Sequence, residues 1–173
     1  MKRRWLTATL LILILPGAYV PAAAMQTAKA VPAAVIPATA HPELPQGACD
    51  KTQDGFSAFL DAIVTDPALR AAYSAPQVAE RDLRDPSKPV VRPSEPFRLT
   101  IIDNQWSYDE PGRDPGKLAR VDLSFKLAGN QMRLGFVRAK FSPGDDLIKT
   151  YGPPEAYVFE HMNKCWRLVQ HLR

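Results

Sequence analysis

The chain has 173 residues, of which 46% are hydrophobic and 23% charged, and its formal net charge is +4. Three of the positive charges lie at the N-terminus, at Lys2, Arg3 and Arg4, and their removal would leave a charge of about +1. A near-neutral chain gives no electrostatic argument for binding to nucleic acid or to an anionic membrane surface. The length fits one domain, and no internal repeat is visible.

The N-terminal segment has the order of a secretory signal peptide. Basic residues are followed by an apolar stretch over residues 5–20, which Pro16 interrupts, and then by the small residues 21–24. A membrane-spanning helix needs about 20 apolar residues, and this stretch is shorter. We expect cleavage after Ala24, export to the periplasm or the exterior, and no stable membrane span after cleavage.

A tether and a single domain are expected after the signal peptide. Residues 25–48 are rich in Ala and Pro, which excludes regular helix and predicts a disordered tether. Residues 49–173 then form one α+β domain. Its two cysteines, Cys49 and Cys165, lie near its two ends, so in an oxidising compartment they are predicted to form a disulfide. The chain-entropy model gives this link on the order of 4 to 5 kcal/mol.

The first half of the domain has helical periodicity. Within residues 51–64 the spacing i, i+3, i+4 and i+7 puts four large apolar side chains on one helix face: Phe56, Phe59, Leu60 and Ile63. Asp66 and Pro67 are the N-cap and first residue of a second helix, expected to run to Ser74. Residues 77–83 fit either a third helical turn or a strand, and the proline-rich residues 85–96 are expected to be a surface connection.

The second half alternates with the period of strands. Residues 97–101 are a predicted strand, followed by a polar loop over 103–116 that contains Trp106 and Tyr108. Residues 121–127 and 132–136 form a predicted hairpin about Gly129 and Asn130, with its apolar residues on one face and Lys126 opposite Arg133. Residues 142–152 are expected to be a loop with a short helical turn capped by Asp145.

A last hairpin is predicted over residues 155–172, turning at Asn163 and Lys164. A continuous register pairs His161 with Trp166 and Tyr157 with Gln170. In that register His161 and His171 face opposite sides of the sheet, which argues against a metal site built from both. The predicted fold is therefore two or three N-terminal helices packed on a curved antiparallel sheet of four to five strands.

This arrangement resembles the nuclear transport factor 2-like, or cystatin-like, cone. The resemblance is carried by the opening amphipathic helix, the second helix ending near Tyr73 and Pro76, and the closing strand with Trp166 and Leu168. It covers roughly residues 49–173. Such domains include isomerases, dehydratases, cyclases and domains that only bind a ligand or partner, so the fold does not assign a function.

An isomerase of this type needs a carboxylate base and an acidic donor in an apolar cavity. Side chains that could face such a cavity, or an exposed contact surface in the case of Trp106 and Tyr108, make up the candidate ligand-binding set: Tyr73, Trp106, Tyr108, Tyr157 and His161. Asp61 and Asp122 are distant candidates for a base. Most buried tyrosines are core residues, so no catalytic residue is assigned.

Charged side chains offer a weaker pattern. The basic residues Lys126, Arg133, Arg138 and Lys140 could hold an anionic ligand or could simply solvate an outer sheet face. Neither cofactor nor metal is expected, because no binding motif stands out.

The leading hypothesis is an exported, non-catalytic domain that binds a small molecule or a partner protein, with a homodimer as one arrangement it could adopt. A small cone-type isomerase or hydrolase-like enzyme is the alternative, and a structural or accessory envelope protein is the second alternative. A carboxylate within hydrogen-bond reach of a tyrosine inside a cavity would favour the enzyme. An apolar lining with arginine at its rim would favour the binder.

Overall fold

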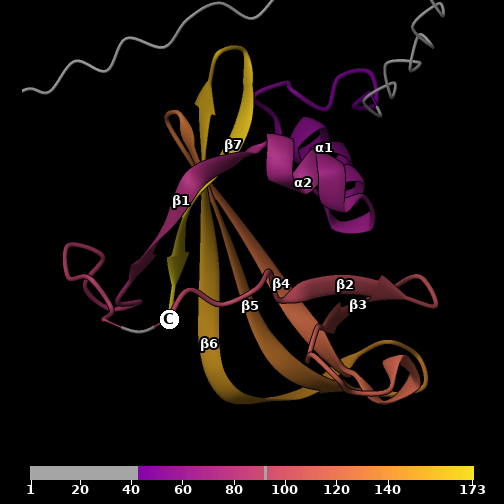
Figure 1. The fold of residues 1–173 in the computed structure, drawn as a ribbon. Coiled ribbons are helices and arrows are strands. Elements are labelled where there is room, and N and C mark those ends of the chain that lie inside the picture. The colour runs from indigo at the N-terminus through magenta and orange to yellow at the C-terminus, as the bar shows by residue number, and fades with distance from the viewer. Residues whose placement is uncertain (1–42, 92) are drawn as a thin grey trace, which may run out of the picture. The chain divides into compact units, whose positions relative to one another are not determined.

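The computed structural model describes residues 43–91 and 93–173, so the predicted signal peptide and most of the predicted tether, residues 25–42, lie outside the described residues. The described chain contains two α-helices, one short 3-10 helix and seven strands (Figure 1). In chain order these are α1 (Gln53–Thr65), α2 (Pro67–Ala72), β1 (Ser74–Arg81), β2 (Leu99–Ile102), β3 (Gln105–Tyr108), η1 (Pro115–Lys117), β4 (Ala119–Ala128), β5 (Gln131–Phe141), β6 (Leu147–Met162) and β7 (Cys165–Leu172). None of the helices in these ranges is long and apolar enough to cross a membrane.

The seven strands form one curled sheet in the order β1-β7-β6-β5-β4-β3-β2. Every neighbouring pair is antiparallel except β1 and β7, which run parallel, so the sheet is mixed. An α+β domain with a curved sheet was expected, and that coarse class is confirmed. The expected four to five strands are too few. In the described chain only two helices precede the sheet, because residues 77–81, which fit either a helical turn or a strand, belong to strand β1.

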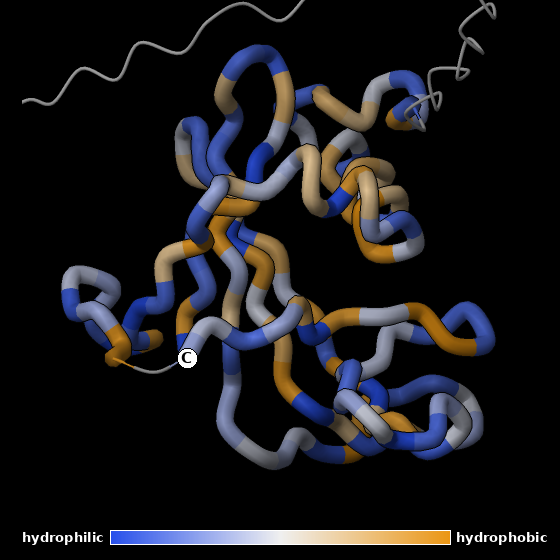
Figure 2. Tube along the Cα trace, viewed as in Figure 1, coloured by the Kyte–Doolittle hydropathy of each residue, from blue (hydrophilic) through white to orange (hydrophobic). Residues whose placement is uncertain are grey.

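The two helices form where the sequence indicates. Thr52 caps α1 by accepting a hydrogen bond from the Gly55 N–H at 3.0 Å, and the predicted apolar face is buried. Asp66 caps α2 by accepting hydrogen bonds from the N–H groups of Ala68 and Leu69, while Pro67 fills the first helical position. Figure 2 shows hydrophobic residues along α1 and along the central strands that this helix packs against.

Two expected loops are partly replaced by strand. Asp103 and Asn104 both adopt positive φ and make a two-residue turn between β2 and β3. Trp106 and Tyr108 therefore lie in a strand and not in a loop, and Tyr108 is buried. The predicted helical turn within residues 142–152 is also wrong, because β6 already begins at Leu147 after a short turn.

The central hairpin has the predicted register, with Leu127 opposite Met132 and Lys126 opposite Arg133. The final hairpin follows its predicted register from Met162 opposite Cys165 as far as Phe159 opposite Leu168, and then shifts by one residue. Val169 is the extra residue of this β-bulge, so Tyr157 pairs with His171 instead of Gln170. Since adjacent residues of a strand point to opposite faces, the bulge moves His171 to the core face, which the continuous register did not predict.

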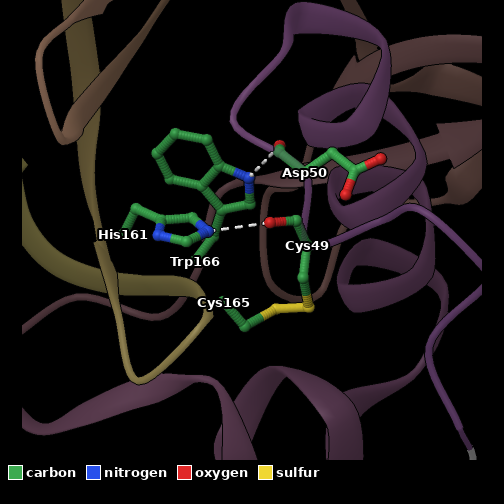
Figure 3. Close-up of a disulfide and its surroundings, with 5 residues drawn as sticks. All are labelled: Cys49, Asp50, His161, Cys165 and Trp166. Atoms are coloured by element: carbon green, nitrogen blue, oxygen red, sulfur yellow. Dashed lines mark hydrogen bonds between the residues drawn. A yellow bond between two sulfur atoms is a disulfide. The ribbon is translucent and has the colours of Figure 1, made fainter.

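The predicted disulfide joins Cys49 to Cys165 across 116 residues of sequence (Figure 3). Two hydrogen bonds reinforce it. The indole Nε1 of Trp166 donates to the carbonyl oxygen of Asp50 at 3.1 Å, and Nε2 of His161 donates to the carbonyl oxygen of Cys49 at 2.8 Å. The segment before α1 is therefore fixed to the hairpin of β6 and β7 by one covalent bond and two polar contacts.

Reduction of the disulfide should lower the free energy of unfolding by about 5 kcal/mol, because the unfolded chain regains the freedom of a long loop. The double variant Cys49→Ser/Cys165→Ser should show the same loss. Urea unfolding followed by tryptophan fluorescence, with and without reductant, measures both effects. A variant that stays as stable as the oxidised protein would contradict the entropic argument.

Gly55 allows the backbone before α1 to approach the helix closely. A Cβ atom at this position would lie 2.7 Å from the carbonyl oxygen of Gly47 and 2.8 Å from that of Asp50. Neither backbone atom can move without disturbing the turn that holds Cys49.

We therefore expect Gly55→Ala to destabilise the protein by about 1 to 3 kcal/mol, although alanine is the better helix former. Gln53→Ala, an exposed change in the same helical turn, is the control and should leave the urea midpoint nearly unchanged. A stabilised Gly55→Ala variant would show that the turn relaxes at no cost.

Candidate functional site

A buried imidazole lies at the inner face of the sheet where β1, β7 and β6 meet. His171, on β7, is 2% exposed and lies beside Glu80 of β1 and Tyr157 of β6 in the strand register. Glu155 lies two residues before Tyr157 and so on the same face of β6. The bulge at Val169 is what brings His171 to these side chains.

Both ring nitrogens of His171 face carboxylates. Nε2 lies 2.8 Å from Oε2 of Glu155, and Nδ1 lies 3.3 Å from Oε2 of Glu80. The side chains of both glutamates are 8% exposed. A carboxylate can only accept hydrogen bonds, so the doubly protonated imidazolium is the form that satisfies both contacts.

Further ionic groups surround this triplet. Arg173 Nε lies 2.7 Å from Oε2 of Glu80, and the Arg173 guanidinium also pairs with Glu95. Arg98 pairs with Glu95 in turn. Three carboxylates thus face two guanidinium groups and one imidazolium, and the charges of this cluster balance when His171 is protonated. Pairing of this kind is what makes buried charges tolerable.

Two tyrosines complete the polar cluster. The hydroxyl of Tyr108 donates to Oε1 of Glu155 at 2.6 Å. The hydroxyl of Tyr157 accepts from the backbone N–H of Arg98 at 2.7 Å, and its own hydrogen has no acceptor in the described chain. We name Glu80, Glu95, Arg98, Tyr108, Glu155, Tyr157, His171 and Arg173 the buried polar network.

Burial alone would raise the pKa of Glu155, but the hydrogen bonds from His171 and Tyr108 outweigh it and hold that pKa below its ordinary value of 4.5. Burial and the hydrogen bond to Glu155 raise the pKa of Tyr108 to about 12. Burial also raises the pKa of Tyr157. At neutral pH the network therefore contains an ionised Glu155 and two phenolic hydroxyls that keep their hydrogens.

The network borders two hollows. The first has a volume of about 610 Å³ and lies between α2, β1 and residues 94–97, with Glu80, His171 and Tyr157 in its wall. The second, of about 370 Å³, is bordered by Tyr108, Glu155 and Arg173. Glu95 borders both. A volume of several hundred Å³ is typical of small-molecule sites.

The structure brings only two of the five candidate ligand-binding residues together, Tyr108 and Tyr157. Tyr73 packs edge-on against Phe59 in the core, and His161 is engaged beside the disulfide. Trp106 borders a separate cleft of about 530 Å³.

That cleft also contains Asp61 and Asp122, the two carboxylates considered as distant bases. Desolvation raises the pKa of Asp61. The aromatic and acidic candidates expected to cooperate therefore lie in different hollows.

Sequence reasoning missed Glu80, Glu155, Arg173 and the inward position of His171. The alternation of side chains in β6 could have indicated one of them. Glu155 lies on the same strand face as Tyr157 and Phe159, and a carboxylate that points into the core requires polar or charged partners. In the ranges that the structure describes, no group of three or more His, Cys, Asp and Glu side chains has a geometry suited to a metal ion.

No protein-family model matches the chain, and comparison with curated proteins and with solved structures gives no significant match. The function therefore has to be inferred from the geometry of the chain's own residues.

The buried polar network should make stability depend on acidity through Glu155. Because the pKa of Glu155 is lower in the folded protein than its unfolded value of about 4.5, the ionised side chain stabilises the fold above that pH. The contribution is lost as the pH falls through the lower folded-state value.

Replacing Glu155 by Gln should cost about 3 kcal/mol at neutral pH, since it removes the anionic partner of His171 Nε2 and leaves only Glu80 beside the ring, and should flatten the loss of stability below pH 4.5. Urea midpoints measured across acidic pH test both effects. Glu160→Gln on the same strand, where the carboxylate bonds to Gln131 outside the network, is the control and should keep the wild-type profile.

Proposed function

We propose that this domain binds a small molecule in the 610 Å³ hollow between α2, β1 and residues 94–97. The observation that carries the proposal is a hollow of ligand size that has apolar side chains along its walls and buried polar groups at one side. Phe97, Val78 and Leu168 are among the apolar residues, while Glu80, Tyr157 and His171 supply the polar ones.

The arrangement favours a ligand with an apolar body and an uncharged polar group. The carboxylates and guanidinium groups of the network are already paired with one another, so a charged group placed against them would be left without a partner. The hydrogen of the Tyr157 hydroxyl is free to donate to such a group. The disulfide is consistent with an oxidising compartment, which supports a role outside the cytoplasm.

An acid–base enzyme is the second candidate, and one contact favours it. The hydroxyl of Tyr108 lies 2.6 Å from Glu155 at the edge of a hollow, which is the pairing expected of an isomerase-type site. His171 would act beside Glu155, as an imidazole oriented by a carboxylate.

The binder ranks first because Glu155 and both nitrogens of His171 already have partners, so neither group is a free base. The resemblance to the nuclear transport factor 2-like cone stays a prediction from the sequence.

Two adjacent alanines of α2 provide a matched test. Ala71 and Ala72 are both exposed, but only Ala71 borders the hollow. Ala71→Trp should fill it and abolish binding of an uncharged apolar fluorescent probe such as N-phenyl-1-naphthylamine, together with any ligand that co-purifies in native mass spectrometry. Ala72→Trp should keep both.

Equal binding by the two variants would exclude this hollow as the site. Unchanged urea midpoints would confirm that any loss in Ala71→Trp arises from occupation of the hollow and not from unfolding.

A further inference from the structure

The far end of the hairpin formed by β5 and β6 carries a basic groove. Its volume is about 770 Å³, and it contains five cationic side chains: Arg113, Lys117, Arg120, Lys140 and Lys149. No aspartate or glutamate of the described chain is among its lining residues. We name these five residues the basic groove.

Two of the five cations have carboxylate partners beside the groove. Arg113 pairs with Glu110, and Arg120 pairs with Asp145 at 2.9 Å. Lys117, Lys140 and Lys149 have no carboxylate within ion-pair distance in the part of the chain that the structure describes. The groove therefore keeps an excess of positive charge although the processed chain as a whole is expected to be nearly neutral.

Lys140 and Lys149 lie directly opposite each other on β5 and β6. Like charges at directly opposed positions destabilise an antiparallel pair, so this arrangement costs folding energy. An anion bound between the two lysines would remove that cost. Charge complementarity thus indicates an anionic partner at this position.

Exposed apolar side chains accompany the lysines. Leu147 is 48% exposed, Ile148 57% and Tyr151 44%. All three lie within the first five residues of β6, close to Lys149. Ile148 falls where the register of β5 and β6 shifts, so it has no partner across the strands. A soluble polyanion would use the cations alone, whereas the interface of an anionic bilayer accommodates both cations and apolar side chains.

We propose that this end of the domain docks on the surface of an anionic lipid bilayer. Leu147, Ile148 and Tyr151 enter the interfacial layer, and the basic groove contacts the phosphates of the headgroups. Figure 1 shows this end of the sheet away from α1 and α2. The 610 Å³ hollow is bordered by α2 and β1, so docking leaves it accessible, and the two proposals can fail independently.

Co-sedimentation with vesicles tests the docking. The full chain, as its host processes it, should bind vesicles of equimolar phosphatidylglycerol and phosphatidylcholine and should not bind vesicles of phosphatidylcholine alone. The variant Lys140→Ala/Lys149→Ala should weaken binding to the anionic vesicles on the order of thirtyfold, given the usual contribution of a lysine at a charged membrane surface.

The matched control is the other directly opposed cationic pair, Lys126 and Arg133 on β4 and β5. Lys126→Ala/Arg133→Ala removes the same charge outside the groove and should leave binding nearly unchanged. Ile148→Ser should remove the part of the binding that resists high salt. Leu127→Ser, at a similarly exposed apolar position of the other hairpin, should not.

Three results would overturn the proposal: equal binding to neutral vesicles, equal loss with the control pair, or binding of heparin without binding of anionic vesicles. The last result would assign the groove to a soluble polyanion. Urea unfolding establishes that each variant is folded, and the exposed single change Lys149→Ala replaces the double variant if that variant does not fold.

Discussion

The burial of His171 is the constraint on which this end of the domain depends. An imidazole can be buried only where both of its ring nitrogens meet polar partners, and here Glu80 and Glu155 come from strands on either side of β7. The two contacts join β1, which runs parallel to β7, and β6, which runs antiparallel to it, at the same point of the sheet. Arg173 and Glu95 extend the pairing to the segment before β2. The same residues supply the polar side chains that border the 610 Å³ and 370 Å³ hollows.

The opposite end of β7 is fixed by different means. Cys165 begins the strand and binds covalently to Cys49, while His161 and Trp166 donate to the carbonyl oxygens of Cys49 and Asp50. One strand therefore carries a covalent attachment at its start and an ionic attachment at its end. The first resists acid but not reductant, and the second resists reductant but not the protonation of Glu155.

Local signals in the sequence predicted the elements that depend on local physics. The four-residue apolar face of α1, the Asp66 and Pro67 start of α2 and the Gly129 and Asn130 turn are each decided by neighbouring residues, and each is confirmed. The disulfide was predictable because only two cysteines exist.

The errors arose where tertiary packing overrides a local pattern. No residue type near Val169 predicts the extra residue there. That single bulge moves His171 to the opposite face of the sheet, so a continuous register does not predict the buried polar network. Asp103 and Asn104 lie in a segment whose polar composition predicts a long loop, although both residue types tolerate the positive φ of a tight turn. Whole-chain charge was equally misleading, because a near-neutral sum conceals the local excess in the basic groove.

The parallel pairing of β1 with β7 has a consequence for the order in which the domain can form. In the described chain β1 is the first strand to be synthesised and β7 is the last. The strand that hydrogen-bonds to β1 is therefore absent until all other strands have been synthesised. The cysteine link spans the same interval. Folding therefore rests on contacts between residues far apart in sequence, which are slow to form and leave strand edges open to other chains during the delay. A domain with this topology can complete its sheet only when the last strand, β7, has become available to β1.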